Sequence, residues 1–230
     1  DALIDRLAMT RGGMTLIDAD RAQSLYDAMG PGREISGGSA ANTLAGLSRL
    51  GHNTAFIGQV AQDQLGDVFA HDIRATGIDF DVPARPGQPS TARCLILVTP
   101  DAQRTMNTFL GAAQFLPETA IDKAKIEGAA WLYLEGYLWN APESRAAMTG
   151  AIAIAKNAGR KVALTLSDAF VVEGHRDEFF ALMDDGSLDL LFANDTEVRA
   201  MMQTDDTEAA VAALAARVPM LVCTHGAAGA

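Results

Sequence analysis

Cysteine, long apolar runs and positive charge are all scarce in this chain. Its two cysteines, Cys94 and Cys223, have the spacing of neither a disulfide framework nor a Cys/His metal site, and we interpret both as buried free thiols. No apolar run reaches the roughly 18 residues of a bilayer-spanning helix. The first residues, with Asp1 and Asp5, lack the pattern of a signal peptide. We therefore expect a cytoplasmic protein that does not contact a membrane.

The charge balance excludes a further class of partner. Lysine and arginine total 18 against 29 aspartates and glutamates, which gives a formal net charge of −11. A chain of this kind has no general attraction for nucleic acid, because that binding needs a basic surface. An anionic substrate would need local neutralisation by a helix N-terminus, a basic side chain or Mg²⁺.

The hydrophobic pattern favours an α/β fold. From residue 131 onward, apolar strands alternate with helical patterns, which indicates a parallel sheet covered by helices on both faces. Between residues 80 and 110 no helical period separates the strand patterns, so we expect an antiparallel segment there. The expected strands are residues 2–4, 14–17, 54–57, 92–98, 104–109, 131–134, 162–166, 188–192 and 220–223, with Val82 in a further short one, and the expected helices begin near residues 20, 42, 64, 142, 173, 195 and 207.

These elements predict one core domain with a lid. The core would comprise residues 1–13, 38–84 and 113–230, and the small antiparallel lid would comprise two insertions, residues 14–37 and 85–112. The sequence stops directly after a strand and a turn, so the last strand would lack its return helix. We therefore expect a further C-terminal portion of the core.

The segment Gly37-Gly38-Ser39-Ala40-Ala41-Asn42 is the first that could carry chemistry. Two glycines before a helix let a ligand approach the backbone closely, and the Asn42 amide can both donate to and accept from a hydroxyl. The segment lacks the lysine of a P-loop and the spacing of a dinucleotide fingerprint. A tight strand-to-helix turn with an exposed asparagine is the structural alternative.

The segment Asn194-Asp195-Thr196-Glu197 directly follows an apolar strand. Asn194 and Glu197 have the spacing of a capping box, which is a complete structural explanation. The functional alternative is that the Glu197 carboxylate faces the crevice at the carboxyl end of the strand, where open α/β sheets bind ligands, and holds water-bound Mg²⁺.

A second glycine-bearing turn, Thr224-His225-Gly226-Ala227-Ala228-Gly229, follows the last strand. We interpret His225 as an exposed turn residue. Asp5, Glu135 and Asp168 close predicted strands, where a carboxylate can accept paired hydrogen bonds from a sugar diol. Each of these acids could equally be a solvated loop residue.

Together these segments resemble the ribokinase-like (PfkB) carbohydrate kinase family. The first glycine–asparagine segment, followed by Gly51, Gly58, Asp63 and Gly66, is similar to that family's N-terminal signature in order and approximate spacing. The segment around Asn194 resembles its N-x-x-E motif, and the Thr224 turn resembles its nucleotide-side T-x-G-x-x-G motif. The likeness runs over essentially the whole chain. It implies a three-layer α/β/α sandwich, ATP and Mg²⁺ as cofactors, and transfer of the γ-phosphoryl group to a hydroxyl.

Within the family the chain looks most like the adenosine kinase branch. Ala2-Leu3-Ile4-Asp5 resembles the first-strand segment of that branch, and residues 164–170 resemble its L-N-L-S-A-P-F stretch. The resemblance implies a primary hydroxyl of a nucleoside ribose as the acceptor. The implied site has Asp5, Gly37, Gly38, Asn42 and Glu135 at the sugar, Phe170 at the base, Asn194, Thr224 and Gly226 at the nucleotide, and Glu197 at Mg²⁺ through water.

The chain also departs from that family. The D-T-x-G-A-G-D segment, which supplies the anion hole and the catalytic aspartate, does not occur, so we expect the base beyond Ala230 and no catalytic residue within this chain. Asp1 stands where the branch usually has asparagine. Three hypotheses remain: an adenosine-type nucleoside kinase, a kinase for a sugar such as ribose or fructose, and a non-catalytic sugar- or nucleoside-binding relative. The expected partner is a nucleoside or sugar, and the expected state is a monomer or homodimer.

Overall fold

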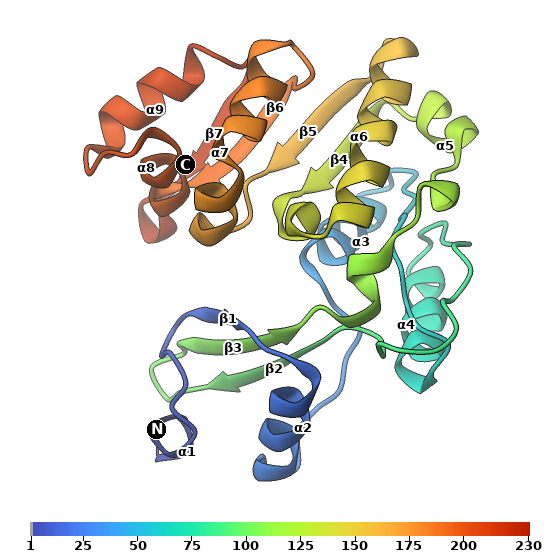
Figure 1. The fold of residues 1–230 in the computed structure, drawn as a ribbon, viewed down its shortest axis with the longest axis vertical. Helices are drawn as coiled ribbons and strands as arrows, with labels where there is room; N and C mark the ends of the chain where they lie inside the picture. The colour runs from blue at the N-terminus through green and yellow to red at the C-terminus, as the bar shows by residue number, and fades with distance from the viewer. Residues whose placement is uncertain (1) are drawn as a thin grey trace. The chain divides into compact units, whose positions relative to one another are not determined.

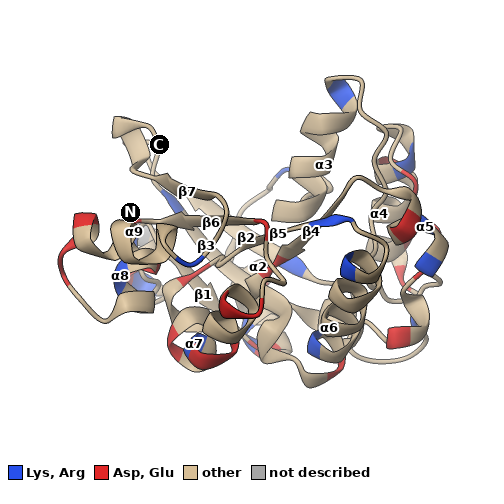
Figure 2. Cartoon of the chain, turned by 90° about the horizontal axis from the view of Figure 1, so that it is seen from above, with Lys and Arg blue, Asp and Glu red and all other residues tan. Residues whose placement is uncertain are grey.

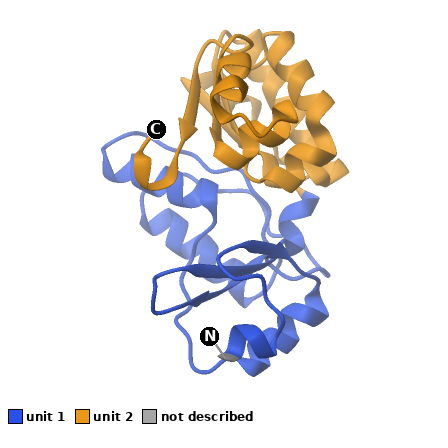
Figure 3. Cartoon of the chain, turned by 90° about the vertical axis from the view of Figure 1, so that its left-hand side faces the viewer, with its two compact units in different colours: residues 1–115 blue, residues 116–230 orange. Residues whose placement is uncertain are grey.

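The computed structural model describes residues 2–230, so Asp1 lies outside the described residues. The chain divides into two compact units, residues 1–115 (unit 1) and residues 116–230 (unit 2), as Figure 3 shows. Each unit has its own sheet, with three strands in unit 1 and four in unit 2. The predicted division into a core domain and a lid has other boundaries than these two units, and it stays a prediction.

Both units combine strands with helices. Unit 1 contains α1 (Ala2–Arg6), β1 (Met14–Leu16), α2 (Ala19–Ala28), α3 (Ser39–Arg49), α4 (Gln64–Ala75), β2 (Arg93–Val98), β3 (Arg104–Phe109) and the 3₁₀ helix η1 (Gly111–Phe115). Unit 2 contains η2 (Glu118–Ala120), α5 (Lys123–Gly128), β4 (Trp131–Glu135), η3 (Gly136–Asn140), α6 (Pro142–Asn157), β5 (Lys161–Thr165), α7 (Ala169–Asp184), β6 (Leu190–Asn194), α8 (Asp195–Met202), α9 (Thr207–Ala215), β7 (Leu221–Thr224) and η4 (Gly226–Ala228).

The small sheet of unit 1 has the strand order β1-β3-β2. Its β2–β3 hairpin is antiparallel, as predicted, but β1 pairs with β3 in parallel. The parallel pairing follows from the connection, because a long crossover that includes α2 joins β1 to the hairpin instead of a tight turn. Helix α2 contacts β2 and β3, and its Ala22 and Leu25 are fully buried. The two predicted insertions therefore share one sheet.

The sheet of unit 2 is parallel throughout, with the strand order β4-β5-β6-β7 (Figure 1). A helix lies in each connection, which is how successive parallel strands are joined. The interior strand β5 is apolar on both faces, and its Val162, Ala163 and Leu164 are all buried. The sequence predicted every strand of this sheet to within two residues. All four carboxyl ends lie at one edge, which becomes the candidate site.

Three strand predictions in unit 1 are wrong. Residues 2–4 form the start of helix α1, where the Leu7 amide donates to the Leu3 carbonyl, because a three-residue apolar run cannot by itself distinguish a strand from a helix. Residues 54–57 make only one isolated parallel bridge, between Ala55 and Asp79, and Val82 lies in no strand. Pro83 follows Val82 and has no N–H to donate to a neighbouring strand, so the residues around Val82 do not extend the Ala55–Asp79 bridge into a strand pair.

Two smaller predictions also need correction. Helix α7 begins at Ala169, four residues earlier than expected, because the Asp168 side chain accepts a hydrogen bond from the Phe170 amide and caps it. Both cysteines are free, but only Cys223 is buried, since Cys94 is exposed on the edge strand β2. No helix within residues 2–230 is long and apolar enough to cross a membrane.

Candidate functional site

The candidate site of unit 2 lies at the carboxyl ends of β6 and β7. The register of these strands places Asn194 directly opposite Thr224, although the two residues are 30 positions apart. The predicted N-x-x-E and T-x-G-x-x-G segments therefore leave the sheet side by side. This is the edge at which open parallel sheets bind ligands.

Asn194 and Glu197 form a complete capping box at the start of α8. The Asn194 Oδ1 atom accepts from the amides of Thr196 and Glu197, both at 2.9 Å. In return, the Glu197 carboxylate accepts from the Asn194 backbone N at 3.0 Å and from its Nδ2 at 2.8 Å. The structural role predicted for this pair is therefore confirmed, and it fixes the carboxylate in one orientation.

The Glu197 carboxylate is also electrostatically unusual. Its side chain is buried, with only 4% of the residue exposed, and it makes no ion pair with a lysine or arginine of residues 2–230. Burial raises the pKa of Glu197, the hydrogen bond from the Asn194 amide opposes this, and the negative charge of Asp168 raises the pKa further. A cation nearby would relieve that repulsion.

These residues fit a magnesium ion bound through water. The donors are the carboxylate oxygens of Asp168 and Glu197, since the Asn194 amide oxygen already accepts two backbone hydrogen bonds, and Mg²⁺ prefers oxygen ligands and keeps several waters. Both Glu197 oxygens already accept hydrogen bonds from Asn194, which favours contact through a water molecule over direct coordination.

The turn after β7 is held by backbone contacts. Gly226 and Gly229 have positive φ angles of 56° and 99°, which the turn requires. The His225 amide donates to the Gly229 carbonyl at 2.7 Å, and the His225 imidazole Nδ1 is hydrogen bonded to Asp195 of α8. The interpretation of His225 as an exposed turn residue is therefore incomplete, because its side chain is only 38% exposed and has a specific partner.

Glu135 and Phe170 lie at the ends of the other two strands. Glu135 closes β4 and receives a hydrogen bond from Tyr133 at 3.4 Å, and Phe170 lies in the first turn of α7 after β5. The backbones leaving β4 and β5 run very close together, since a Cβ on Gly136 would lie 2.5 Å from the Leu166 carbonyl oxygen. All the predicted unit 2 residues therefore share one sheet edge.

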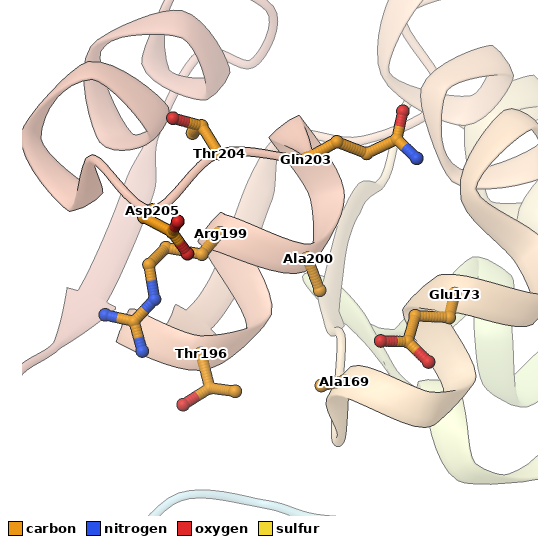
Figure 4. Close-up of a pocket in the computed structure, with 8 residues that line it drawn as sticks. All are labelled: Ala169, Glu173, Thr196, Arg199, Ala200, Gln203, Thr204 and Asp205. Carbon is orange, nitrogen blue, oxygen red and sulfur yellow. The ribbon is translucent and has the colours of Figure 1, made fainter.

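A pocket of about 320 Å³ lies between α7, α8 and the loop that leads to α9 (Figure 4). Ala169 and Thr196, which line the pocket, lie in the first turns of α7 and α8. The other lining residues include the charged Glu173, Arg199 and Asp205. Figure 2 shows several acidic residues on α7. The pocket therefore adjoins the helix starts that follow β5 and β6, with charges of both signs around it.

In unit 1 the Gly37–Asn42 segment forms the entry to α3. Gly38 is the N-cap with φ 105°, a conformation that favours glycine, and its carbonyl accepts from the Asn42 amide at 2.9 Å. A Cβ added at Gly37 or Gly38 would meet no atom within 4 Å, and Asn42 is exposed. The backbone of this segment is open to a ligand within unit 1.

Asp5 is not brought to that segment. It lies on α1, which stands well apart from α3 within unit 1 (Figure 1), and its carboxylate is 3.2 Å from the Arg11 guanidinium. Because the expected strand is a helix, Asp5 does not close a strand. Its role at the sugar stays a prediction from resemblance.

Several other members of the predicted signature have structural roles. Asp63 caps α4 and accepts from the Gly66 amide at 2.8 Å. A Cβ on Gly66 would lie 2.1 Å from the Ala61 carbonyl oxygen, and one on Gly58 would lie 2.5 Å from the Phe56 ring. Gly66 therefore excludes a side chain because backbone lies in the way, whereas at Gly58 the Phe56 ring would have to shift.

Comparison with known proteins finds similarity to carbohydrate and nucleoside kinases. A family model described as "pfkB family carbohydrate kinase" matches residues 12–230. The structure of adenosine kinase from Sinorhizobium meliloti is 43% identical, with a TM-score of 0.93 over 98% of this chain and 69% of that one. A structure described as "probable sugar kinase protein" from Rhizobium etli is also 43% identical, with a TM-score of 0.94 over 98% of this chain and 68% of that one.

A curated relative, "Probable fructokinase-7" from Arabidopsis thaliana, is 30% identical over 166 residues, or 69% of this chain. The chain spans only 44% of the length of that protein. The two structural similarities confirm the predicted fold class.

Proposed function

Because the chain belongs to the pfkB family of carbohydrate kinases, we propose that the protein is an ATP-dependent kinase that phosphorylates a primary hydroxyl of a nucleoside ribose. The observation that carries this proposal is the register of Asn194 opposite Thr224, which joins the two nucleotide-side segments at one sheet edge. An adenosine-like acceptor is favoured by the 43% identity to an adenosine kinase and by the position of Phe170 beside that edge.

In this proposal the substrate-side residues have the roles that the resemblance to the family implies. Asn42 and the backbone at Gly37 and Gly38 hold sugar hydroxyls. In unit 2, Glu135 contacts the sugar, and the Phe170 ring contacts the base. Asp5, whose place in the structure differs from the expected one, contributes to the sugar contacts only as the resemblance implies.

The nucleotide is held at the ends of β6 and β7. Thr224 and Gly226 offer a hydroxyl and a backbone amide to phosphate oxygens, and the N-terminus of α8 favours negative charge. Glu197 and Asp168 would hold Mg²⁺ through water, with Asn194 fixing the Glu197 carboxylate. When bound, Mg²⁺ would neutralise charge on the transferred phosphoryl group. The acceptor hydroxyl proton would go to the catalytic aspartate that the resemblance implies and that residues 1–230 do not include.

A sugar kinase is the second candidate. It is favoured by the "probable sugar kinase protein" of Rhizobium etli, which matches this chain with 43% identity as well, and by the fructokinase. The non-catalytic alternative keeps the hydroxyl-binding segment but transfers nothing. Cytoplasmic location and a monomeric or homodimeric state stay predictions from the sequence.

The test is ADP formation by the full-length gene product with adenosine, ribose or fructose as the only acceptor. Turnover of adenosine, with little turnover of the two sugars, is the expected result. Turnover of ribose or fructose but not adenosine would support the sugar kinase instead. Adenosine binding without ADP formation from any acceptor would support the non-catalytic alternative.

A variant pair sharpens the test of the base contact. Phe170→Ala should raise the KM for adenosine at least about 10-fold, since it removes an aromatic contact with the base. Phe180→Ala is the matched control, because Phe180 lies on the same helix but stacks under the Arg217 guanidinium. If the two substitutions raised the KM for adenosine equally, Phe170 would have a structural role alone.

A further inference from the structure

Asp195, Cys223 and His225 bring three different metal-ligating atoms together beside the nucleotide-side segments. The carboxylate oxygen, the thiol Sγ and an imidazole nitrogen all lie within 4.8 Å of one another. We propose that these three residues form a binding site for a borderline-soft transition-metal ion such as Zn²⁺. The site is distinct from the oxygen-donor group around Glu197, and it does not depend on the proposed kinase activity.

The backbone geometry that assembles the three residues is fixed by the sheet. The β6–β7 register pairs Ala193 with Cys223 and Asn194 with Thr224, so Asp195 and His225 each come one position after a paired residue. The capping box holds the start of α8, and the bond from the His225 amide to Gly229 holds the turn. Three ligands from two neighbouring strand ends are therefore positioned before any ion arrives.

The separations suit a small ion after modest movement. A tetrahedral zinc site with bonds of about 2.0–2.3 Å places its ligand atoms about 3.3–3.8 Å apart. The three ligand atoms of this cluster lie within 4.8 Å of one another, so no pair has to close by more than about 1.5 Å, while the hydrogen-bonded Asp195 and His225 have to separate slightly to admit the ion. Asp195 and His225 are each 38% exposed at the side chain, which leaves them room to do so.

The donor set selects the kind of ion. Thiolate and imidazole favour zinc and similar transition metals, whereas Mg²⁺ takes oxygen ligands. On coordination the Cys223 thiol loses its proton to solvent and the sulfur lone pair forms the bond to the metal. His225 would bind through Nδ1 and keep its proton on Nε2. The fourth position stays open to water, as in an accessible site.

The local charge also attracts a cation. Within residues 2–230, Asp195 forms an ion pair only with His225, and Glu197 forms none with a lysine or arginine. Asp195 and Glu197 are therefore not neutralised by a lysine or arginine among the described residues. The structural alternative is a plain Asp195–His225 pair beside an inert buried thiol, and it predicts no specific metal affinity.

The test is titration of the metal-free purified protein with Co²⁺, followed by absorbance, and with Zn²⁺, followed by calorimetry. The expected result is one ion per chain with a thiolate-to-cobalt charge-transfer band, unaffected by millimolar Mg²⁺. Cys223→Ser should abolish the band, and His225→Gln should weaken Zn²⁺ binding at least about 100-fold. His225→Gln keeps the test valid if the buried serine disturbs folding.

The chain offers matched controls of both residue types. Cys94 is a free, exposed cysteine on β2, and His52 is an exposed histidine, so Cys94→Ser and His52→Gln should leave the band and the affinity unchanged. Absence of a charge-transfer band in the unsubstituted protein would overturn the proposal. Loss of the band in Cys94→Ser, or unchanged Zn²⁺ affinity in His225→Gln, would overturn it as well.

Discussion

Replacing Asp63 by alanine should loosen the start of helix α4. One Asp63 carboxylate oxygen accepts from the Gly66 amide at 2.8 Å and from the Thr91 hydroxyl at 2.7 Å, and the other accepts from the Thr91 amide at 2.8 Å. The Thr91 hydroxyl accepts in turn from the Ala61 amide at 2.9 Å. A single carboxylate therefore ties the first turn of α4 to the segment that leads into β2.

The expected cost has two parts. Loss of an N-cap costs about 1 kcal/mol. The Thr91 amide, in a residue only 6% exposed, would lose its partner, which adds about 1–3 kcal/mol. The sum is about 2–4 kcal/mol in the free energy of opening this region. At the lower end, that corresponds to about 30-fold faster exchange of the α4 amides.

The assay has to report on unit 1. Both tryptophans, Trp131 and Trp139, lie in unit 2, so their fluorescence does not follow α4. Hydrogen exchange of peptides covering residues 64–75 does. Asp67→Ala is the matched control, because Asp67 is an exposed acid in the first turn of the same helix. If both substitutions changed exchange equally, the Thr91 contribution would be refuted.

The pH dependence gives an independent check. Burial alone would raise the pKa of Asp63, but the hydrogen bonds from Thr91 and Gly66 and the positive charge of Arg93 outweigh it and hold the pKa below its ordinary value. A lowered pKa in the folded state means that the stabilisation is complete above the ordinary value and is lost as pH falls through the folded one. Protection of α4 should therefore fall in acid, and this component should be missing in Asp63→Asn.

Three further predictions concern other contacts. Gly66→Ala should destabilise unit 1 by more than about 2 kcal/mol, because the new Cβ would lie 2.1 Å from a backbone carbonyl oxygen. Gly46→Ala in α3 is the control, because its Cβ would meet nothing within 4 Å, and it should stabilise unit 1 by up to about 1 kcal/mol. The free energies of unfolding of both variants can be compared by urea titration. Glu178→Ala removes the acceptor 2.8 Å from the buried Trp139 Nε1, so tryptophan fluorescence should change and unit 2 should lose about 1–3 kcal/mol. Glu197→Gln can keep its bond from Asn194 and should mainly raise the Mg²⁺ concentration needed for half-maximal ADP formation; an unchanged Mg²⁺ dependence would leave Glu197 with the capping role alone.

The parallel sheet was predictable because its strands carry strong signals. Strand β5 is apolar on both faces, and Pro142 marks the start of the neighbouring helix α6. Helix α1 and the bridge at Ala55 were not predictable in this way. Their apolar runs are three or four residues long, and only tertiary contacts decide whether such a run is helical, bridged or irregular.

The candidate site divides along a similar line. The capping box could be predicted from the sequence, because its two partners, Asn194 and Glu197, lie within one helical turn. The proximity of Asp195, Cys223 and His225 was not, because it depends on the register between β6 and β7. A shift of one residue in that register would have sent the Cys223 side chain to the other face of the sheet.

The predicted glycine–asparagine signature contains residues of two physical kinds. Asp63 and Gly66 are required by contacts within unit 1, so any protein with this local fold would need them whatever it binds. Gly38 is required by its positive φ angle. Asn42 differs, because it is exposed and its side-chain amide has no hydrogen-bond partner among residues 2–230. Contacts within the described residues give no reason for an asparagine there, and the proposed sugar contact, in which a hydroxyl would use both the donor and the acceptor of the amide, would supply one.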